Sequence, residues 1–198
     1  MSYVIYSIKG GVGKTTLSVQ ISQMLEYTYV TNDPHSSAHN LLPEEKGFLV
    51  SKDEYEEIPY DDNVVYDFGG FIDPRINDII KQSNKVLIPT LTSIVDLQAT
   101  LATLKDVIEI NNNIIILINR AKNNNKANEL KDYLLEEIKK EYKEVQIPII
   151  FVRESSVLED SLFDCEYVEN KAGNNRFKRH IYRNAIEDLN NIKNILKD

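Results

Sequence analysis

The sequence has little of what builds disulfides, zinc sites or membrane spans. Its single cysteine, Cys165, excludes an internal disulfide and fits a reducing compartment. The three histidines (His35, His39 and His180) lack the cysteine partners that a metal cluster would need. The longest unbroken aliphatic run, residues 114–118, is far shorter than the roughly 20 residues that cross a bilayer. Because the first residues also lack the basic region of a secretory signal, we expect a cytoplasmic protein without a membrane partner.

The overall composition is that of a soluble globular protein. Of 198 residues, 42% are hydrophobic and 27% are charged, and this length suffices to bury a core. The formal charge of −8 argues against a surface that coats DNA everywhere, but it leaves room for a local basic patch. No linker divides the chain, so we expect residues 1–198 to form a single domain.

Short apolar stretches alternate with segments of helical periodicity. Strands are predicted at residues 3–7, 27–30, 63–66, 85–89, 113–118 and 146–152. Helices are predicted from Lys14 onward and at residues 73–83, 93–110, 125–142 and 174–196. Strands rich in valine and isoleucine, each followed by a helix, predict a three-layer, doubly wound α/β fold whose mostly parallel sheet is covered on both faces.

Two segments carry more specific expectations. Residues 43–62 are acidic and irregular, which predicts a solvated excursion on the surface. The last helix has an apolar stripe at three- and four-residue spacing that we expect to be buried: Phe177, Ile181, Ala185, Leu189, Ile192 and Leu196.

The first predicted strand runs into a glycine-rich loop, IKGGVGKTT at residues 8–16, and then into a helix. Unhindered backbone N–H groups at the glycines can wrap a phosphate, and the helix adds the positive end of its dipole. Lys14 can reach the β- and γ-phosphates, while the Thr15 hydroxyl is placed to ligate Mg²⁺. We therefore expect Mg-ATP to bind at eight consecutive residues: Lys9, Gly10, Gly11, Val12, Gly13, Lys14, Thr15 and Thr16.

A second lysine, Lys9, precedes the glycine pair, and Ile8 stands where the usual phosphate loop has glycine. This deviant Walker A loop resembles that of the ParA/MinD family of P-loop ATPases, nearest to the small plasmid-partition members. The resemblance implies an ATP-dependent homodimer in which two subunits close face to face over two nucleotides. Lys9 would then reach the partner's phosphates, like an arginine finger that contributes about 10³–10⁵ in rate.

The resemblance extends to the sequence TNDPH at residues 31–35. Asp33 matches the family's second aspartate, which orients the attacking water, so the implied catalytic residues are Lys9, Lys14 and Asp33. Thr31 stands where the first aspartate is usual, and His35 replaces glutamine. The alternative for Asp33, which precedes a proline, is plain turn chemistry.

Four later residues complete the implied nucleotide site. Asp67 ends an apolar strand in a Walker B arrangement and, with Thr15, would hold the Mg²⁺. Asn119 and Arg120 follow another strand where the family contacts adenine, although an exposed turn is an alternative. Arg153 would line the other side of the base, but the usual proline is missing there.

A basic stripe marks the last predicted helix. Arg176, Arg179 and Arg183 lie at i, i+3 and i+7, and no acidic residue occurs between positions 170 and 186. We expect these arginines to contact DNA phosphates without reading bases, and a solvated helix face is the alternative.

The favoured function is a ParA-like ATPase that is nucleoid-associated through nonspecific DNA and drives partition or positioning of a plasmid or other cargo. A ParB-like or small DNA-binding adaptor would stimulate hydrolysis. Thr31 and His35 leave open a nucleotide-dependent regulatory module with weak turnover. A MinD-like positioning ATPase would need a basic amphipathic tail, whereas this chain ends in mixed charge. A metabolic ligase on a related fold is a further alternative, although such enzymes lack the signature lysine.

Overall fold

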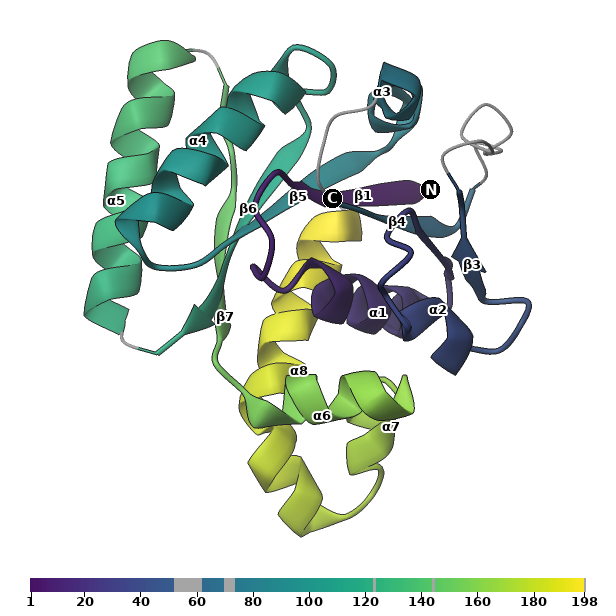
Figure 1. The fold of residues 1–198 in the computed structure, drawn as a ribbon. Coiled ribbons are helices and arrows are strands. Elements are labelled where there is room, and N and C mark those ends of the chain that lie inside the picture. Colours follow the sequence, from purple (N-terminus) through teal and green to yellow (C-terminus); the bar gives the residue numbers. More distant parts are fainter. Residues whose placement is uncertain (52–61, 70–73, 123, 144, 198) are drawn as a thin grey trace.

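Seven parallel strands form the central sheet of the computed structural model, which describes residues 1–51, 62–69, 74–122, 124–143 and 145–197. Their spatial order is β3-β2-β4-β1-β5-β6-β7 (Figure 1). All strand pairings are parallel in the part of the chain described. The strands are β1 (Ser2–Ser7), β2 (Thr28–Thr31), β3 (Gly47–Leu49), β4 (Val64–Gly69), β5 (Lys85–Thr90), β6 (Ile114–Ala121) and β7 (Ile149–Arg153).

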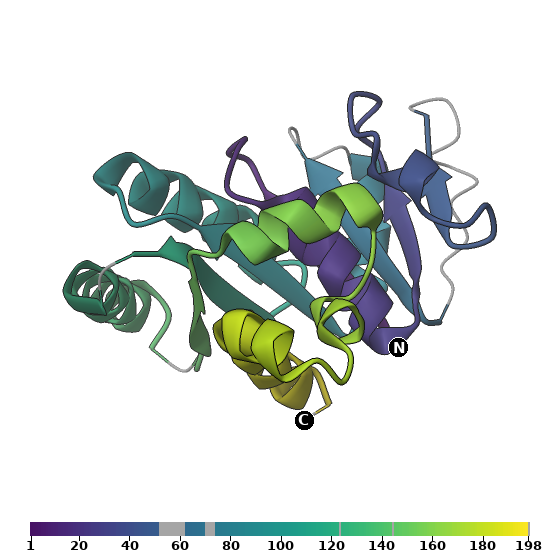
Figure 2. The same ribbon diagram turned by 90° about the horizontal axis from the view of Figure 1, so that it is seen from below.

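Helices cover both faces of this sheet, which confirms the predicted three-layer α/β fold (Figure 2). Three pack on one face: α3 (Pro74–Gln82), α4 (Ile94–Ile108) and α5 (Asn124–Glu141). The other face is covered by α1 (Lys14–Leu25), α2 (Ala38–Leu41), α6 (Ser156–Asp164), α7 (Val168–Ala172) and α8 (Arg176–Lys197). None of the described helices combines the length and hydropathy that a membrane span requires.

The two-residue period of a strand explains why β1 has no polar alternation. Val4 and Tyr6 point into the core below α3, α4 and α5, whereas Tyr3 and Ile5 point into the core below α1 and α8. Each buried side chain of this size contributes about 1.5–3 kcal/mol of transfer free energy. A sheet buried on both faces therefore needs continuous apolar strands, as the sequence has.

The strand order changes direction at β1. After β1 the chain forms β2, β3 and β4 on one side of it, and then adds β5, β6 and β7 on the other side. In open parallel sheets, ligands bind at the carboxyl ends of the strands at such a switch point. The glycine-rich loop follows β1 at that position.

The structure corrects three expectations. Residues 43–62 are not irregular throughout, because β3 lies among them and pairs with β2; residues 52–61 are outside the described part of the chain. The short helices α2, α6 and α7 were not predicted. In α8 the predicted stripe is buried from Ala185 onward, but Phe177 and Ile181 are 74% and 51% exposed. The reason is that the first turns of α8 extend past the sheet, where periodicity alone cannot supply a core (Figure 1).

Candidate functional site

The loop between β1 and α1 holds a backbone shape that requires glycine. Gly11 and Gly13 have φ angles of +76° and +89°, in the left-handed region that favours glycine. A Cβ atom added to Gly13 would lie 2.2 Å from Nδ2 of Asn119. This amide donates a hydrogen bond to the carbonyl oxygen of Val12 at 2.9 Å, so β6 fixes the loop directly. Asn119 thus supports the phosphate loop itself, a contact that the sequence did not reveal.

Lys14, the first residue of α1, lies at the mouth of this loop. Its Nζ donates to the carbonyl oxygen of Lys9 at 3.0 Å, and a Cβ atom at Gly69 would lie 3.2 Å from its Cε. Burial lowers the pKa of Lys14, and the nearby carboxylates of Asp67 and Asp33 oppose that shift. A half-buried ammonium is suited to an anionic ligand, and the phosphates of a nucleotide are such a ligand.

Asp67 of β4 lies beside the loop, close to Thr15 and Lys14. It is 2% exposed; the Thr15 hydroxyl hydrogen-bonds to its side chain, and the hydroxyl of Tyr29 donates to its Oδ2 at 2.8 Å. Burial raises the pKa of Asp67, and the hydrogen bonds from Thr15 and Tyr29 and the charge of Lys14 oppose that shift.

The donors at this position fit magnesium. A carboxylate and a hydroxyl, with phosphate oxygens added by a nucleotide, are the hard oxygen ligands that Mg²⁺ prefers. Within the described residues, no cluster of three or more His, Cys, Asp or Glu side chains offers an all-protein metal site. Mg²⁺ is commonly held by one or two protein oxygens and substrate phosphates, so Thr15 and Asp67 are the residues that would hold it.

The segment after β2 is tied to the strand that carries Asp67. The Thr31 hydroxyl donates to the carbonyl oxygen of Asp67 at 3.1 Å and accepts from the backbone N–H of Asp33 at 3.2 Å. The Asp33 side chain is exposed and its Oδ1 accepts from the backbone N–H of His35 at 2.9 Å. Asp33 therefore makes the local turn contact of the alternative interpretation, and it also lies close enough to influence Lys14.

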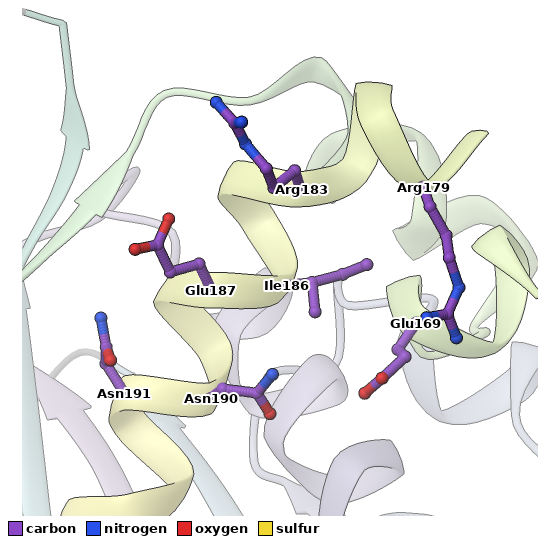
Figure 3. Close-up of a pocket in the computed structure, with 7 residues that line it drawn as sticks. All are labelled: Glu169, Arg179, Arg183, Ile186, Glu187, Asn190 and Asn191. Atoms are coloured by element: carbon purple, nitrogen blue, oxygen red, sulfur yellow. The ribbon is translucent and has the colours of Figure 1, made fainter. Parts of the chain in front are cut away.

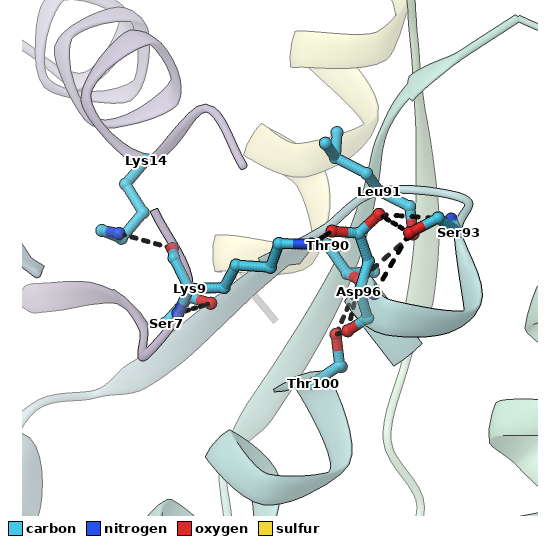
Figure 4. A network of polar contacts seen from close by, with 8 residues as sticks. All are labelled: Ser7, Lys9, Lys14, Thr90, Leu91, Ser93, Asp96 and Thr100. Atoms are coloured by element: carbon cyan, nitrogen blue, oxygen red, sulfur yellow. Dashed lines mark hydrogen bonds and ion pairs between the residues drawn. The ribbon is translucent and has the colours of Figure 1, made fainter. Parts of the chain in front are cut away.

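The two lysines of the loop are directed to opposite sides (Figure 4). Lys9 forms an ion pair with Asp96 of its own chain, near the start of α4. Asp96 also completes the capping box of that helix with Ser93. Burial raises the pKa of Asp96, but hydrogen bonds from Lys9 and Ser93 outweigh it and hold that pKa below its usual value. Lys9 thus has a charged partner before any second chain is considered.

Three predicted base-contacting residues meet at one small pocket beside the loop. Asn119, Arg120 and Arg153 line it together with loop residues Gly13 and Thr16. The sequence analysis did not place the further lining residues here, which are Leu17 of α1 and, at the start of α6, Ser155, Leu158 and Glu159.

Both arginines at this pocket are engaged by acids. Arg120 pairs with Glu159 at 3.0 Å, and Arg153 pairs with Asp188 at 2.6 Å and with Glu187 at 2.9 Å. The hydrogen bond to Asp188 is the main cause of the raised pKa of Arg153. Arg153 therefore joins β7 to α8, and its guanidinium is already engaged by these two acids.

The basic stripe of α8 is exposed but has acidic neighbours that the sequence did not place there. Arg176, Arg179 and Arg183 are exposed on the first turns of the helix. Figure 3 shows Arg179 beside Glu169 of α7, and Arg183 one turn before Glu187. Arg179 also donates to the carbonyl oxygen of Gly173 at 2.6 Å. Two of the three arginines thus share an open groove with carboxylates.

The comparison with family models decides the classification. Residues 3–162 match the CobQ/CobB/MinD/ParA nucleotide binding domain. The chain belongs to this nucleotide-binding family. The resemblance inferred from the deviant loop is therefore confirmed at the level of the family. Among curated proteins, none matches the chain at a significant level.

Solved structures of family members share the fold. The chain is 17% identical to apo McdA of Cyanothece, with a TM-score of 0.62 over 95% of this chain and 98% of McdA. It is 15% identical to the septum site-determining protein MinD of Pyrococcus horikoshii with Mg-ADP, with a TM-score of 0.60 and 99% coverage of each. A plasmid partition protein of Borrelia burgdorferi is 14% identical, with a TM-score of 0.53 over 83% and 95%. Identities this low support the fold alone.

Proposed function

We propose that this protein is a ParA-like ATPase that binds Mg-ATP, dimerises around the nucleotides and moves or positions a cargo on nonspecific DNA. The observation that carries the proposal is the opposed orientation of the two lysines. Lys14 lies in the phosphate loop next to Thr15 and Asp67, while Lys9 points away from the loop toward Asp96. A lysine directed away from its own phosphate site could reach a second one once it leaves Asp96.

Binding rests on the loop and its surroundings. The backbone N–H groups of the loop would take the phosphates, and Lys14 would offset their charge in the ground state. Mg²⁺, when bound, would supply positive charge that stabilises the negative charge developing on the phosphates. Thr15 and Asp67 would orient it, and Asn119 and Arg120 would border the base. Residues 1–198 would serve this function as one domain.

Hydrolysis would need two further residues. Asp33 would orient the attacking water near the γ-phosphate, and its influence on Lys14 supports that location. Lys9 of one protomer would stabilise charge on the nucleotide of its partner, for which it must first leave Asp96. Contacts made only in the transition state raise turnover rather than affinity.

DNA and adaptor binding complete the proposal. A dimer would present two copies of the α8 arginines, so its electrostatic contact with phosphates would be stronger than that of a monomer. A ParB-like or small DNA-binding adaptor would then trigger hydrolysis and release from the nucleoid.

A second candidate, a nucleotide-dependent regulatory module with weak turnover, has one specific observation in its favour. The Asp33 carboxylate already accepts a hydrogen bond from His35 in its own turn. A carboxylate held in this way is less available to a water.

Release of inorganic phosphate from ATP, measured with and without duplex DNA, separates the two functions. Wild-type turnover that Lys14→Ala abolishes would support the ATPase. Tight nucleotide binding without phosphate release would favour the regulatory module. Absence of nucleotide binding in the wild type would contradict both.

A further inference from the structure

Tyr29 is a buried tyrosine whose hydroxyl points at the proposed metal site. It lies in β2 and is 0% exposed, yet it belongs to none of the nucleotide-binding motifs. Buried tyrosine hydroxyls need a hydrogen-bond partner, and this one donates to Oδ2 of Asp67 at 2.8 Å. A ring that only filled the core would not need this hydroxyl, which here contacts the Asp67 carboxylate.

The strand register explains how the contact forms. β2 and β4 are parallel, with Thr31 opposite Asp67 and Tyr29 opposite Val65. Tyr29 and Asp67 are therefore diagonal neighbours on one face of the sheet, a separation that a long aromatic side chain can span. Phenylalanine at position 29 would fill the same space but could not donate to the carboxylate.

The ring of Tyr29 is held on the α1 face of the sheet. It belongs to a small buried cluster with Val19 of α1, Ala38 and Leu42 at α2, and Cys165 after α6. Because side chains from several elements surround the ring, its hydroxyl has little freedom to turn away from Asp67.

The same hydroxyl lies near the segment that follows β2. The Ser36 hydroxyl lies near enough to the Tyr29 hydroxyl to influence its pKa. Ser36 lies three residues after Asp33 and its backbone N–H donates to the Asp33 carbonyl at 3.0 Å. Tyr29 therefore stands between the carboxylate of the proposed metal site and the loop that carries the proposed water-orienting residue.

We infer that Tyr29 is a positioning residue for the magnesium site: it fixes the Asp67 carboxylate in the orientation that meets Thr15, and it lies between that carboxylate and Ser36 in the loop after β2. This inference rests on the proposed function. Residues that orient metal-binding groups from behind change metal affinity by about 10- to 100-fold when they are replaced. Tyr29 is 0% exposed, so a bound nucleotide would not touch it and metal-free nucleotide binding should not depend on it.

The test measures metal binding without turnover. The probe is Mn²⁺ added to the ADP-loaded protein. Binding is measured as the loss of the free Mn²⁺ signal in electron paramagnetic resonance. Tyr29→Phe should weaken Mn²⁺ binding by about 10- to 100-fold. ADP binding in EDTA, measured by calorimetry, should stay at the wild-type value.

The matched control is Tyr3→Phe. Tyr3 is also buried, and its hydroxyl donates to the Leu196 carbonyl oxygen at 2.9 Å rather than to a residue of the proposed metal site. Its loss should lower thermal stability as Tyr29→Phe does, but leave Mn²⁺ affinity unchanged.

Each outcome has a distinct meaning. Equal Mn²⁺ affinity in Tyr29→Phe and Tyr3→Phe would overturn the positioning role while leaving the proposed function intact. A parallel loss of ADP binding in EDTA would also overturn it, since the effect would then be general. Wild-type protein that binds neither ADP nor Mn²⁺ would contradict the proposed function instead.

Discussion

Lys9 and Asp96 form an ion pair within one chain, although they are 87 positions apart in the sequence. The Asp96 side chain is only 5% exposed, whereas that of Lys9 is 30% exposed. The acid is thus held at the start of α4, and the lysine is the more exposed partner. If Lys9 serves a partner's nucleotide, this ion pair competes with dimerisation.

Asp96→Asn should therefore promote ATP-dependent dimerisation. Asparagine can still cap α4 next to Ser93, but it no longer holds the ammonium by charge. The dimer should form at lower protein concentration than in the wild type, as measured by equilibrium sedimentation with ATP and Mg²⁺. Lys9→Ala should show no ATP-dependent dimer.

Two results would count against this view. A dimer of equal stability without nucleotide would argue against the nucleotide sandwich itself. Identical dimerisation of Asp96→Asn and wild type would show that the ion pair does not compete with the partner.

Asp33→Ala should keep nucleotide binding and dimerisation but lose most turnover. The reason is that Asp33 is exposed and would act only on the attacking water. Lys14→Ala should instead lose binding, because this lysine would offset phosphate charge in the ground state as well. Calorimetric ATP binding and phosphate release, measured on both variants, distinguish the two roles. Hydrolysis by Asp33→Ala at the wild-type rate would remove Asp33 from the mechanism.

Asp188→Ala should destabilise the fold without acting on the phosphate loop. Asp188 is buried and accepts from both the backbone N–H of Arg153, at 2.8 Å, and its guanidinium, at 2.6 Å. Hydrogen bonds to charged groups each contribute about 1.5–3 kcal/mol, and Arg153 can regain some water because it is 34% exposed. We expect a loss of about 2–3 kcal/mol in the free energy of unfolding, measured with urea.

Glu159→Ala is the control for that measurement. Glu159 forms an ion pair with Arg120, and the two side chains are 55% and 43% exposed, respectively. Loss of this ion pair should lower the free energy of unfolding by only about 0–1 kcal/mol. Equal losses for the two variants would mean that the Arg153–Asp188 pair does not anchor α8.

The parts of this molecule that could be predicted from sequence are those whose chemistry is local. Gly13 and Lys14 are adjacent in the chain, so the sequence of strand, loop and helix around them predicted a phosphate site. Asp96 and Tyr29 gave no such signal. Each reaches its partner through the sheet topology, and a tyrosine in an apolar strand looks like any other core residue.

The α8 stripe shows a different limit. Helical spacing identified the side on which Phe177 and Ala185 both lie, and Ala185 is buried as expected. Spacing cannot tell where a helix leaves the sheet, so Phe177 was wrongly assigned to the core. Likewise, the absence of acids between residues 170 and 186 did not show that Glu169 of α7 lies beside Arg179 (Figure 3).

The last prediction concerns DNA binding by the α8 arginines, which Glu169 beside Arg179 would oppose. If the α8 arginines bind phosphates, affinity for duplex DNA should be higher with ATP than with ADP and independent of base sequence. The logarithm of the binding constant should fall with the logarithm of salt concentration by about 0.9 per phosphate neutralised. Replacing Arg176, Arg179 and Arg183 together by alanine should flatten that slope by roughly three units. The matched control removes the same charge from exposed lysines at and after the end of α5: Lys139, Lys140 and Lys143. If both triple variants dimerise and bind DNA equally well, the DNA surface lies elsewhere or the protein has none.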